Sequence, residues 1–149
     1  MMSVRRLTAG TLFLAAAVVA TDAGAAELKV LSVEAMRPAL QELAKEFEAA
    51  SKHTLKIDYA TAAAIEKKLA DGEEYDIVIV DNAITKKLDA AARIAGGSTK
   101  VLAKQSPDLS YDASTTNSTE QPFADKALID FLGGPKAAEV YKAKGMQPG

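Results

Sequence analysis

The residues best suited to chemistry in this sequence are polar side chains that follow three short apolar runs. Ser32, Thr61 and Asp81 each stand at the end of such a run, next to small residues. A hydroxyl group at the start of a helix can bind a small anion together with free backbone N–H groups and the positive end of the helix dipole. The pattern predicts an oxyanion site formed by Ser32, Val33, Thr61, Ala62 and Asp81.

Simpler roles exist for the same polar side chains. Ser, Thr and Asp are also the residues that most often cap the start of a helix, which would occupy Ser32 and Thr61 without any ligand. Asp81, with a neighbouring carboxylate, could serve acid–base chemistry in a small hydrolase. Both alternatives stay open at the level of the sequence.

Catalytic signatures are missing from the chain. The sequence has no GxGxxG, P-loop, HExxH or GxSxG motif, and no cysteine for a thiolate nucleophile or a zinc site. His53 is the single histidine and lies in a turn, where a solvated surface side chain is expected. Two acidic groups, Glu42, Glu46 and Glu48 in one and Glu73, Glu74 and Asp76 in the other, are expected to be solvated charge. We therefore expect a binding protein that is no enzyme and needs no metal or cofactor.

The elements that must position these residues form an α/β pattern over residues 26–97. Strands are expected around Leu28–Leu31, Leu55–Tyr59 and Ile77–Val80, each followed by a helix-period segment. The second strand alternates polar and apolar residues and the third is continuously apolar, which places the second outside and the third inside a mostly parallel sheet. The loops leaving parallel strands converge at one edge, so the candidate site residues are expected there.

Three helices are expected between and after these strands. The first spans about Ala35 to Ser51, the second starts after Thr61 and stops at Gly72, and the third stops at Gly96–Gly97. Residues 98–120 form a polar connecting segment, for which short strands near 100–103 and 109–113 and an irregular linker are both open. Residues 121–149 return to helical spacing and are expected to complete the lobe with two helices.

The first 25 residues are typical of a cleavable secretory signal. Arg5 and Arg6 precede the apolar run Leu7–Ala20, and Ala23–Gly24–Ala25 fits a signal-peptidase site, with cleavage after Ala25 or Ala26. The protein is therefore expected in the periplasm, with no stable membrane span after cleavage. A net charge of −2 over 149 residues argues against nucleic acid as a partner.

Four stretches of the sequence resemble the molybdate-binding-type substrate-binding proteins of bacterial ABC transporters, which have the type II periplasmic binding fold. The stretches are Glu27–Ser32 with Ala35–Leu40, Phe47–Ser51, Tyr75–Ile79, and Lys126–Leu132 with Ala143–Gly149. The resemblance implies a small-molecule or oxyanion ligand, an ABC permease as partner, and first-lobe ligand contacts at Ser32 and at Thr61–Ala62.

The chain departs from that family pattern in two places. Its middle passes from the first lobe directly to the returning C-terminal segment, so we expect a single three-layer lobe that lacks the second lobe. Glu34 replaces the usual small neutral residue and would repel an oxyanion unless Arg37 offsets its charge. The expected function is that of a solute-binding protein of an ABC transporter, whose ligand is a small anion of the molybdate type. The alternative is a truncated, non-binding interaction module or remnant that pairs with another chain through its exposed lobe face.

Overall fold

The computed structural model describes residues 24–149, so the predicted signal segment, residues 1–25, lies almost wholly outside it. Six strands are present: β1 (Glu27–Val33), β2 (Thr54–Ala60), β3 (Ile77–Asp81), β4 (Lys100–Ser106), β5 (Leu109–Thr115) and β6 (Gln147–Pro148). The helices are a short 3₁₀ turn (Glu34–Met36), α1 (Arg37–Ser51), α2 (Ala62–Ala70), α3 (Asn82–Ala90), α4 (Pro122–Leu132) and α5 (Pro135–Ala143).

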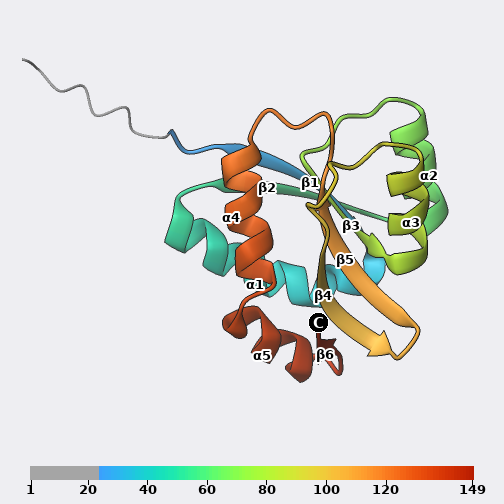
Figure 1. Cartoon of the computed structure of the whole chain (residues 1–149). Coiled ribbons are helices and arrows are strands. Elements are labelled where there is room, and N and C mark those ends of the chain that lie inside the picture. The colour runs from blue at the N-terminus through green and yellow to red at the C-terminus, as the bar shows by residue number, and fades with distance from the viewer. Residues whose placement is uncertain (1–23) are drawn as a thin grey trace, which may run out of the picture.

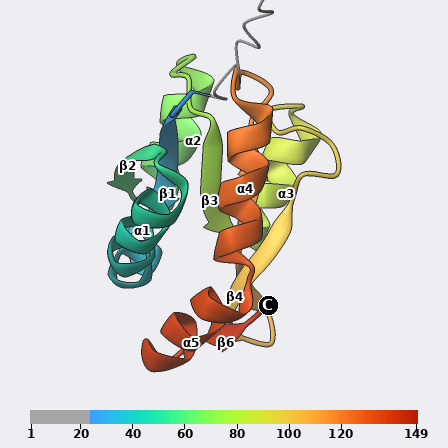
Figure 2. The same ribbon diagram turned by 90° about the vertical axis from the view of Figure 1, so that its left-hand side faces the viewer.

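The strands form one sheet in the order β2-β1-β3-β5-β4-β6, covered by helices on both faces. Helices α2 and α3 lie on one face, and α1, α4 and α5 pack together on the other (Figures 1 and 2). This arrangement confirms the predicted α/β lobe with three layers. It also confirms that the second strand is at the edge and the third inside the sheet.

The sheet is mixed, so the prediction of a mostly parallel sheet holds only for its first half. β1 pairs in parallel with β2 and β3, whereas β5 runs antiparallel to β3, and β4 runs antiparallel to β5 and β6. The reason is the connection between β4 and β5. Only two residues, Pro107 and Asp108, separate these strands, and so short a turn can join only antiparallel neighbours.

The polar segment after α3 carries part of the core. β4 and β5 form a hairpin, and β5 buries Tyr111, Ala113 and Ser114 between β3 and β4. The Ser and Thr residues of β5 give little contrast in hydropathy with their neighbours, so the alternation of polar and apolar residues that marks a strand is weak in the sequence. Thr and Tyr nevertheless favour strands, which is the local signal for β5.

Helix α3 ends earlier than the predicted stop at Gly96–Gly97. Ala92 has φ 52° and closes the helix, with its N–H bonded to Asp89 O and the Arg93 N–H bonded to Leu88 O. This pair of bonds is a Schellman cap, in which the left-handed residue is usually glycine. α2 and α5 end in the same way with Gly72 and Gly145.

Replacing Ala92 with glycine is expected to raise the free energy of unfolding by about 1 kcal/mol, because a Cβ in the left-handed region is strained. Chemical denaturation measures the change. The control is Ala90→Gly, inside the last turn of α3, where glycine should instead cost about 0.5–1 kcal/mol. If both variants lose stability alike, Ala92 carries no strain.

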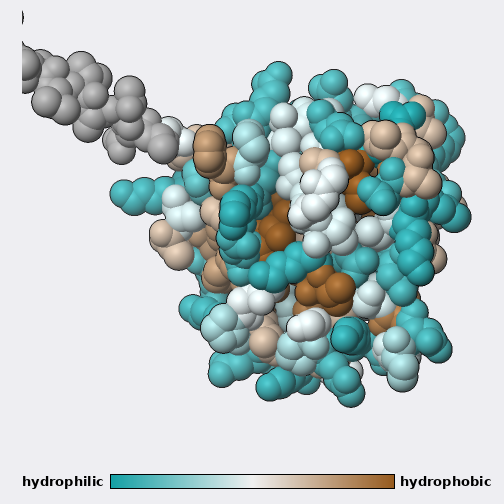
Figure 3. All heavy atoms as spheres, viewed as in Figure 1, coloured by the Kyte–Doolittle hydropathy of each residue, from teal (hydrophilic) through white to brown (hydrophobic). Residues whose placement is uncertain are grey.

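The face of the molecule seen in Figure 3 shows little continuous apolar area. In the view of Figure 3, hydrophobic residues form separate spots among hydrophilic ones. Among residues 24–149, the exposed large hydrophobic side chains are Val101 and Phe123. No helix among these residues is long and apolar enough to cross a membrane.

Candidate functional site

The carboxyl ends of the first three strands meet along one edge of the sheet. Val33 of β1 lies opposite Ala60 of β2, and Ser32 lies opposite Ile79 of β3. The loops that follow, residues 33–35, 60–62 and 81–83, are called the strand-end edge below. The register brings the predicted site residues to this edge, beside the β4–β5 hairpin in Figure 1.

At the end of β1, Ser32 and Val33 face into the protein. Ser32 is fully buried and its hydroxyl donates a hydrogen bond of 3.1 Å to the Val33 carbonyl; Val33 itself is 7% exposed. In this arrangement the Ser32 hydroxyl is bonded to backbone and has no exposed surface. Ser32 and Val33 therefore shape the strand end and do not present side chains to solvent.

The start of α2 does face solvent. Thr61 is exposed and caps the helix, its Oγ1 accepting a hydrogen bond from the Ala64 N–H at 3.3 Å. The N–H groups of Ala62 and Ala63 belong to the first turn, where a helix offers them no acceptor. The neutral hydroxyl of Thr61 thus accepts a hydrogen bond from one amide, that of Ala64. The amides of Ala62 and Ala63 are two further donors at the positive end of the helix dipole.

The start of α3 is already filled by a carboxylate. Asp81 is half-buried and its Oδ1 accepts hydrogen bonds from the Ala83 and Ile84 N–H groups, both at 3.0 Å. Next to it, the Asn82 side chain donates to the Asp108 carbonyl at 3.1 Å and ties the hairpin turn to α3. The Asp81 carboxylate thus takes the place that an anionic ligand would have at the first amides of α3.

Glu34 and Arg37 form an ion pair beside the edge, at the i,i+3 spacing. Arg37 donates two hydrogen bonds to the Glu34 carboxylate, at 2.7 and 2.8 Å. Its guanidinium carbon lies 4.4 Å from the centre of the Tyr59 ring. This hydrogen bonding raises the pKa of Arg37, and burial raises the pKa of the Tyr59 phenol. Arg37 thus offsets the charge of Glu34, and Tyr59 is a member of this group that the sequence did not single out.

Two hollows of the surface differ in their position relative to the strand-end edge. One of about 400 Å³ adjoins the edge at Ala35 and is lined by Pro38, Gln105, Lys144, Gly145 and Met146 as well. A larger one, about 450 Å³, lies between β4 and α4 and includes Lys100, Thr115, Pro122 and Ile129. The second contains none of the predicted site residues.

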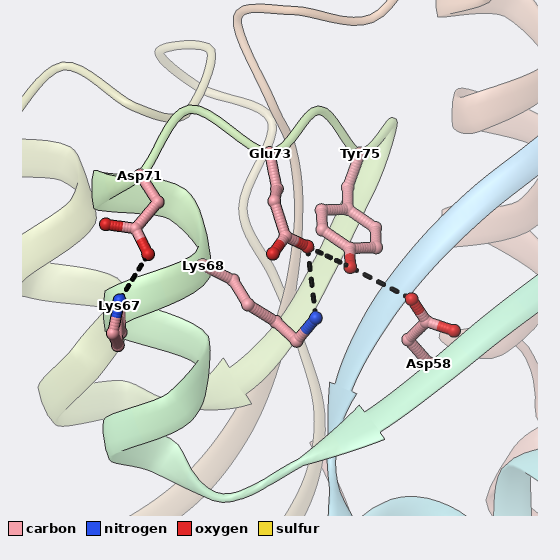
Figure 4. Close-up of polar contacts among 6 residues, drawn as sticks. All are labelled: Asp58, Lys67, Lys68, Asp71, Glu73 and Tyr75. Atoms are coloured by element: carbon pink, nitrogen blue, oxygen red, sulfur yellow. Dashed lines mark hydrogen bonds and ion pairs between the residues drawn. The ribbon is translucent and has the colours of Figure 1, made fainter.

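Of the acidic residues expected to be solvated charge at the turn before β3, Glu73 and Glu74 are exposed, as expected, and Asp76 is half-buried. The Tyr75 hydroxyl lies 2.9 Å from Asp58 and 3.0 Å from Glu73, and Lys68 donates to Glu73 at 3.0 Å (Figure 4). Burial and these two carboxylates raise the pKa of Tyr75 to about 12. The cluster joins the start of β3 to the edge strand β2, and within it the exposed Glu73 also has a structural role.

His53 differs from the expected solvated side chain. It is half-buried, its Nδ1 accepts a hydrogen bond of 2.9 Å from the Ala26 N–H, and its ring stacks on Phe47. Among residues 24–149, no group of three or more His, Cys, Asp or Glu side chains could hold a metal ion.

Solved structures with the same fold include two molybdate-related proteins. A substrate-binding domain assigned to a molybdenum ABC transporter of Clostridium difficile superposes with a TM-score of 0.76 at 10% identity, over 84% of this chain and all of that one. A periplasmic molybdate-binding protein of Azotobacter vinelandii gives 0.73 at 14% identity, over 80% and 98% of the two chains.

The fold is also found in a regulatory protein. The OxyR regulatory domain of Pseudomonas aeruginosa superposes with a TM-score of 0.51 at 13% identity, over 72% of this chain and 97% of that one. At such identities the likeness establishes the fold alone.

Sequence comparison identifies the family. No curated protein matches the chain. The family model of bacterial extracellular solute-binding proteins, however, matches residues 28–107, which is more than half of the chain and runs from the second residue of β1 to the end of β4, with the whole strand-end edge. The chain belongs to the family of bacterial extracellular solute-binding proteins.

Proposed function

We propose that this protein binds a small oxyanion of the molybdate type at the strand-end edge, as the solute-binding component of an ABC transporter. The observation that carries the proposal is the start of α2, where the exposed Thr61 caps the helix and the N–H groups of Ala62 and Ala63 have no acceptor within the helix. The molybdate-related proteins that share the fold support this class of ligand.

The three helix starts at the edge differ in what they offer an anion. Asp81 already fills the start of α3, and Glu34 stands at the 3₁₀ turn before α1 with its charge balanced by Arg37. Only the start of α2, among these three, has an exposed neutral cap. Amide donors of this kind bind oxyanions without a full positive charge on the protein.

The other predicted site residues act around the Thr61 and Ala62 donors. Ser32 and Val33 hold the end of β1 in register with Ala60, so they position the loop from inside. Asp81 sets a limit on the site, because an oxyanion that approached its carboxylate would be repelled. The ligand is therefore centred on α2.

The alternative of a protein that pairs through an apolar lobe face has less support. Interaction faces of that kind usually need a continuous apolar patch of several hundred square ångströms. Val101 and Phe123 are the exposed large hydrophobic residues among residues 24–149, and they lie on different elements, β4 and α4. A hydrolase based on Asp81 is also less favoured, because both of its bonds cap α3.

The proposed place of action is the periplasm, after cleavage of the signal near Ala25 or Ala26. An ABC permease is the expected partner in the membrane. We propose no catalytic step, no cofactor and no role in nucleic acid binding for this chain.

Replacing Glu34 with glutamine is expected to strengthen oxyanion binding by up to about fivefold, because it removes a negative charge and frees Arg37 at the edge. Titration calorimetry at low salt measures the change. Glu42→Gln is the matched control, since Glu42 on α1 forms an exposed ion pair at 3.4 Å with Lys144, at the end of α5. Weaker binding in the Glu34 variant would show that the ligand carries positive charge there.

Thermal melting with added anions is a first test of the proposal. Molybdate, tungstate, sulfate and phosphate are each added at millimolar concentration to the protein beginning at Ala26, with chloride at equal ionic strength as control. A ligand present at 100 times its Kd should stabilise the fold by about 2.7 kcal/mol. A melting temperature that stays unchanged with all four anions would contradict the proposal.

A further inference from the structure

Two aspartates from distant parts of the chain meet at one threonine hydroxyl. Asp76 precedes β3, Thr119 follows β5, and Asp125 lies in α4, which stands in front of β3 in Figure 2. Thr119 Oγ1 is 2.6 Å from Asp125 Oδ2 and 3.0 Å from Asp76 Oδ1. The three residues are far from the strand-end edge, at the opposite ends of β1 and β3.

The Thr119 hydroxyl has too few protons to donate a hydrogen bond to two ionised carboxylates. Thr119 has one hydroxyl proton and also accepts a hydrogen bond of 3.0 Å from the Gln121 N–H. It can therefore donate to one carboxylate only. The other close oxygen–oxygen contact requires a proton on that carboxyl group, since two unprotonated oxygens at such a distance repel each other.

Asp125 is the group that fits the additional proton. Asp76 has a hydrogen-bond donor for each oxygen of an ionised carboxylate. Its Oδ2 accepts a hydrogen bond from the Lys29 N–H at 2.8 Å, and its Oδ1 can accept one from the Thr119 hydroxyl. Asp125 is fully buried, and its Oδ1 makes no hydrogen bond within residues 24–149. If Asp125 donates to Thr119, every donor and acceptor of the Thr119 hydroxyl is used.

We propose that Asp125 is a protonated acid in the folded protein at mildly acidic pH and acts as a pH-sensitive latch between α4 and the start of β3. Loss of the proton leaves a buried charge facing the Asp76 carboxylate, which weakens the attachment of α4. Burial, with the charge of Asp76 as a further contribution, raises the pKa of Asp125 to about 6, and the Thr119 bond opposes this shift.

The other charges around Asp125 do not compensate a buried anion. On α4 itself, Lys126 is exposed and engaged with Asp130 at 2.5 Å. In the segment before α4, Glu120 is exposed and has the same sign as Asp125; on β1, Lys29 contributes its backbone N–H to Asp76. The dipole of α4 favours a charge on Asp125, but by less than the burial of an unpaired charge costs.

The sign of the pH effect follows from the raised pKa. The folded state holds the proton more tightly than the unfolded state, whose aspartate has an ordinary pKa. The stabilisation is present in full below the unfolded pKa and is lost as the pH rises through about 6. Between pH 5 and pH 8, the unfolding constant should rise roughly tenfold from this group.

Asp125→Asn tests the latch, because asparagine keeps the shape and can donate to Thr119 at every pH. Urea denaturation of the full chain is measured at pH 5 and pH 8 for wild type and variant. The ratio of their unfolding constants should change roughly tenfold between the two pH values, in favour of the variant at pH 8. The comparison cancels the contributions of the groups that both proteins share. A ratio that is the same at both pH values overturns the proposal.

The control is Asp130→Asn, an exposed aspartate on the same helix, whose pKa is lowered by Lys126. It should leave the pH profile unchanged. A second measurement covers the case in which Asp125→Asn does not fold: the carboxyl carbon of Asp125 in the wild-type protein is followed by NMR. A titration midpoint near pH 6 supports the latch, and one near pH 4 or below overturns it. Neither result depends on whether the protein binds an oxyanion.

Discussion

Ala62→Pro is expected to weaken oxyanion binding by about tenfold or more while the protein stays folded. Proline removes the N–H of Ala62, and a hydrogen bond to a charged group contributes roughly 1.5–3 kcal/mol. The fold should tolerate the change, because Ala62 is the first residue of α2, where proline is favoured. Thr61 also has the extended backbone, φ −71° and ψ 158°, that a residue before proline needs.

Titration calorimetry with the tightest-binding anion measures the loss of affinity. The matched control is Ala62→Ser, which changes the same side chain and keeps the N–H, so its affinity should stay within about twofold of wild type. Thermal melting of both variants shows whether the fold is retained. If Ala62→Pro binds as tightly as Ala62→Ser, the amide of Ala62 takes no part in binding.

Tyr141→Ala is expected to lower the free energy of unfolding by about 3–5 kcal/mol. The Tyr141 side chain is 1% exposed, and its hydroxyl donates to the Leu132 carbonyl at 2.8 Å. It fills the space between α5 and the end of α4, and burial raises the pKa of its phenol. Its removal leaves a cavity and an unpaired carbonyl in the layer that also contains α1.

Thermal melting should show the loss as a fall of roughly 10–20 °C. Phe123→Ala is the control, since Phe123 is an aromatic residue of α4 that is 89% exposed, and the change should cost less than about 0.5 kcal/mol. Two separate transitions in the Tyr141 variant, one of them unchanged, would show that the C-terminal helices are not part of the same folding unit as the sheet.

The first half of the fold was predictable from local patterns. The alternating residues of β2 and the continuous apolar run of β3 correctly placed these strands at the edge and inside the sheet. The second half depends on contacts between distant segments. The antiparallel direction of β5 follows from the two-residue turn at Pro107–Asp108, and the early end of α3 follows from Ala92, whose left-handed backbone the sequence does not reveal.

Individual side chains of the candidate site were less predictable than the edge on which they lie. Thr61 does cap α2, as one of the two expected roles required. The burial of Ser32 and the double cap formed by Asp81 depend on how β1 and β3 sit in the sheet, which no local pattern specifies. The stacking of Arg37 on Tyr59 was hidden because the two residues lie on different elements, α1 and β2.

Calorimetric titration of the protein beginning at Ala26 with molybdate, tungstate, sulfate and phosphate tests the central claim most directly. Binding at the start of α2 predicts a saturable heat with one site per chain for at least one of these anions, and a loss of that heat in Ala62→Pro. A folded protein that releases no heat with any of the four, or an anion affinity that is the same in wild type and Ala62→Pro, would contradict oxyanion binding at the strand-end edge.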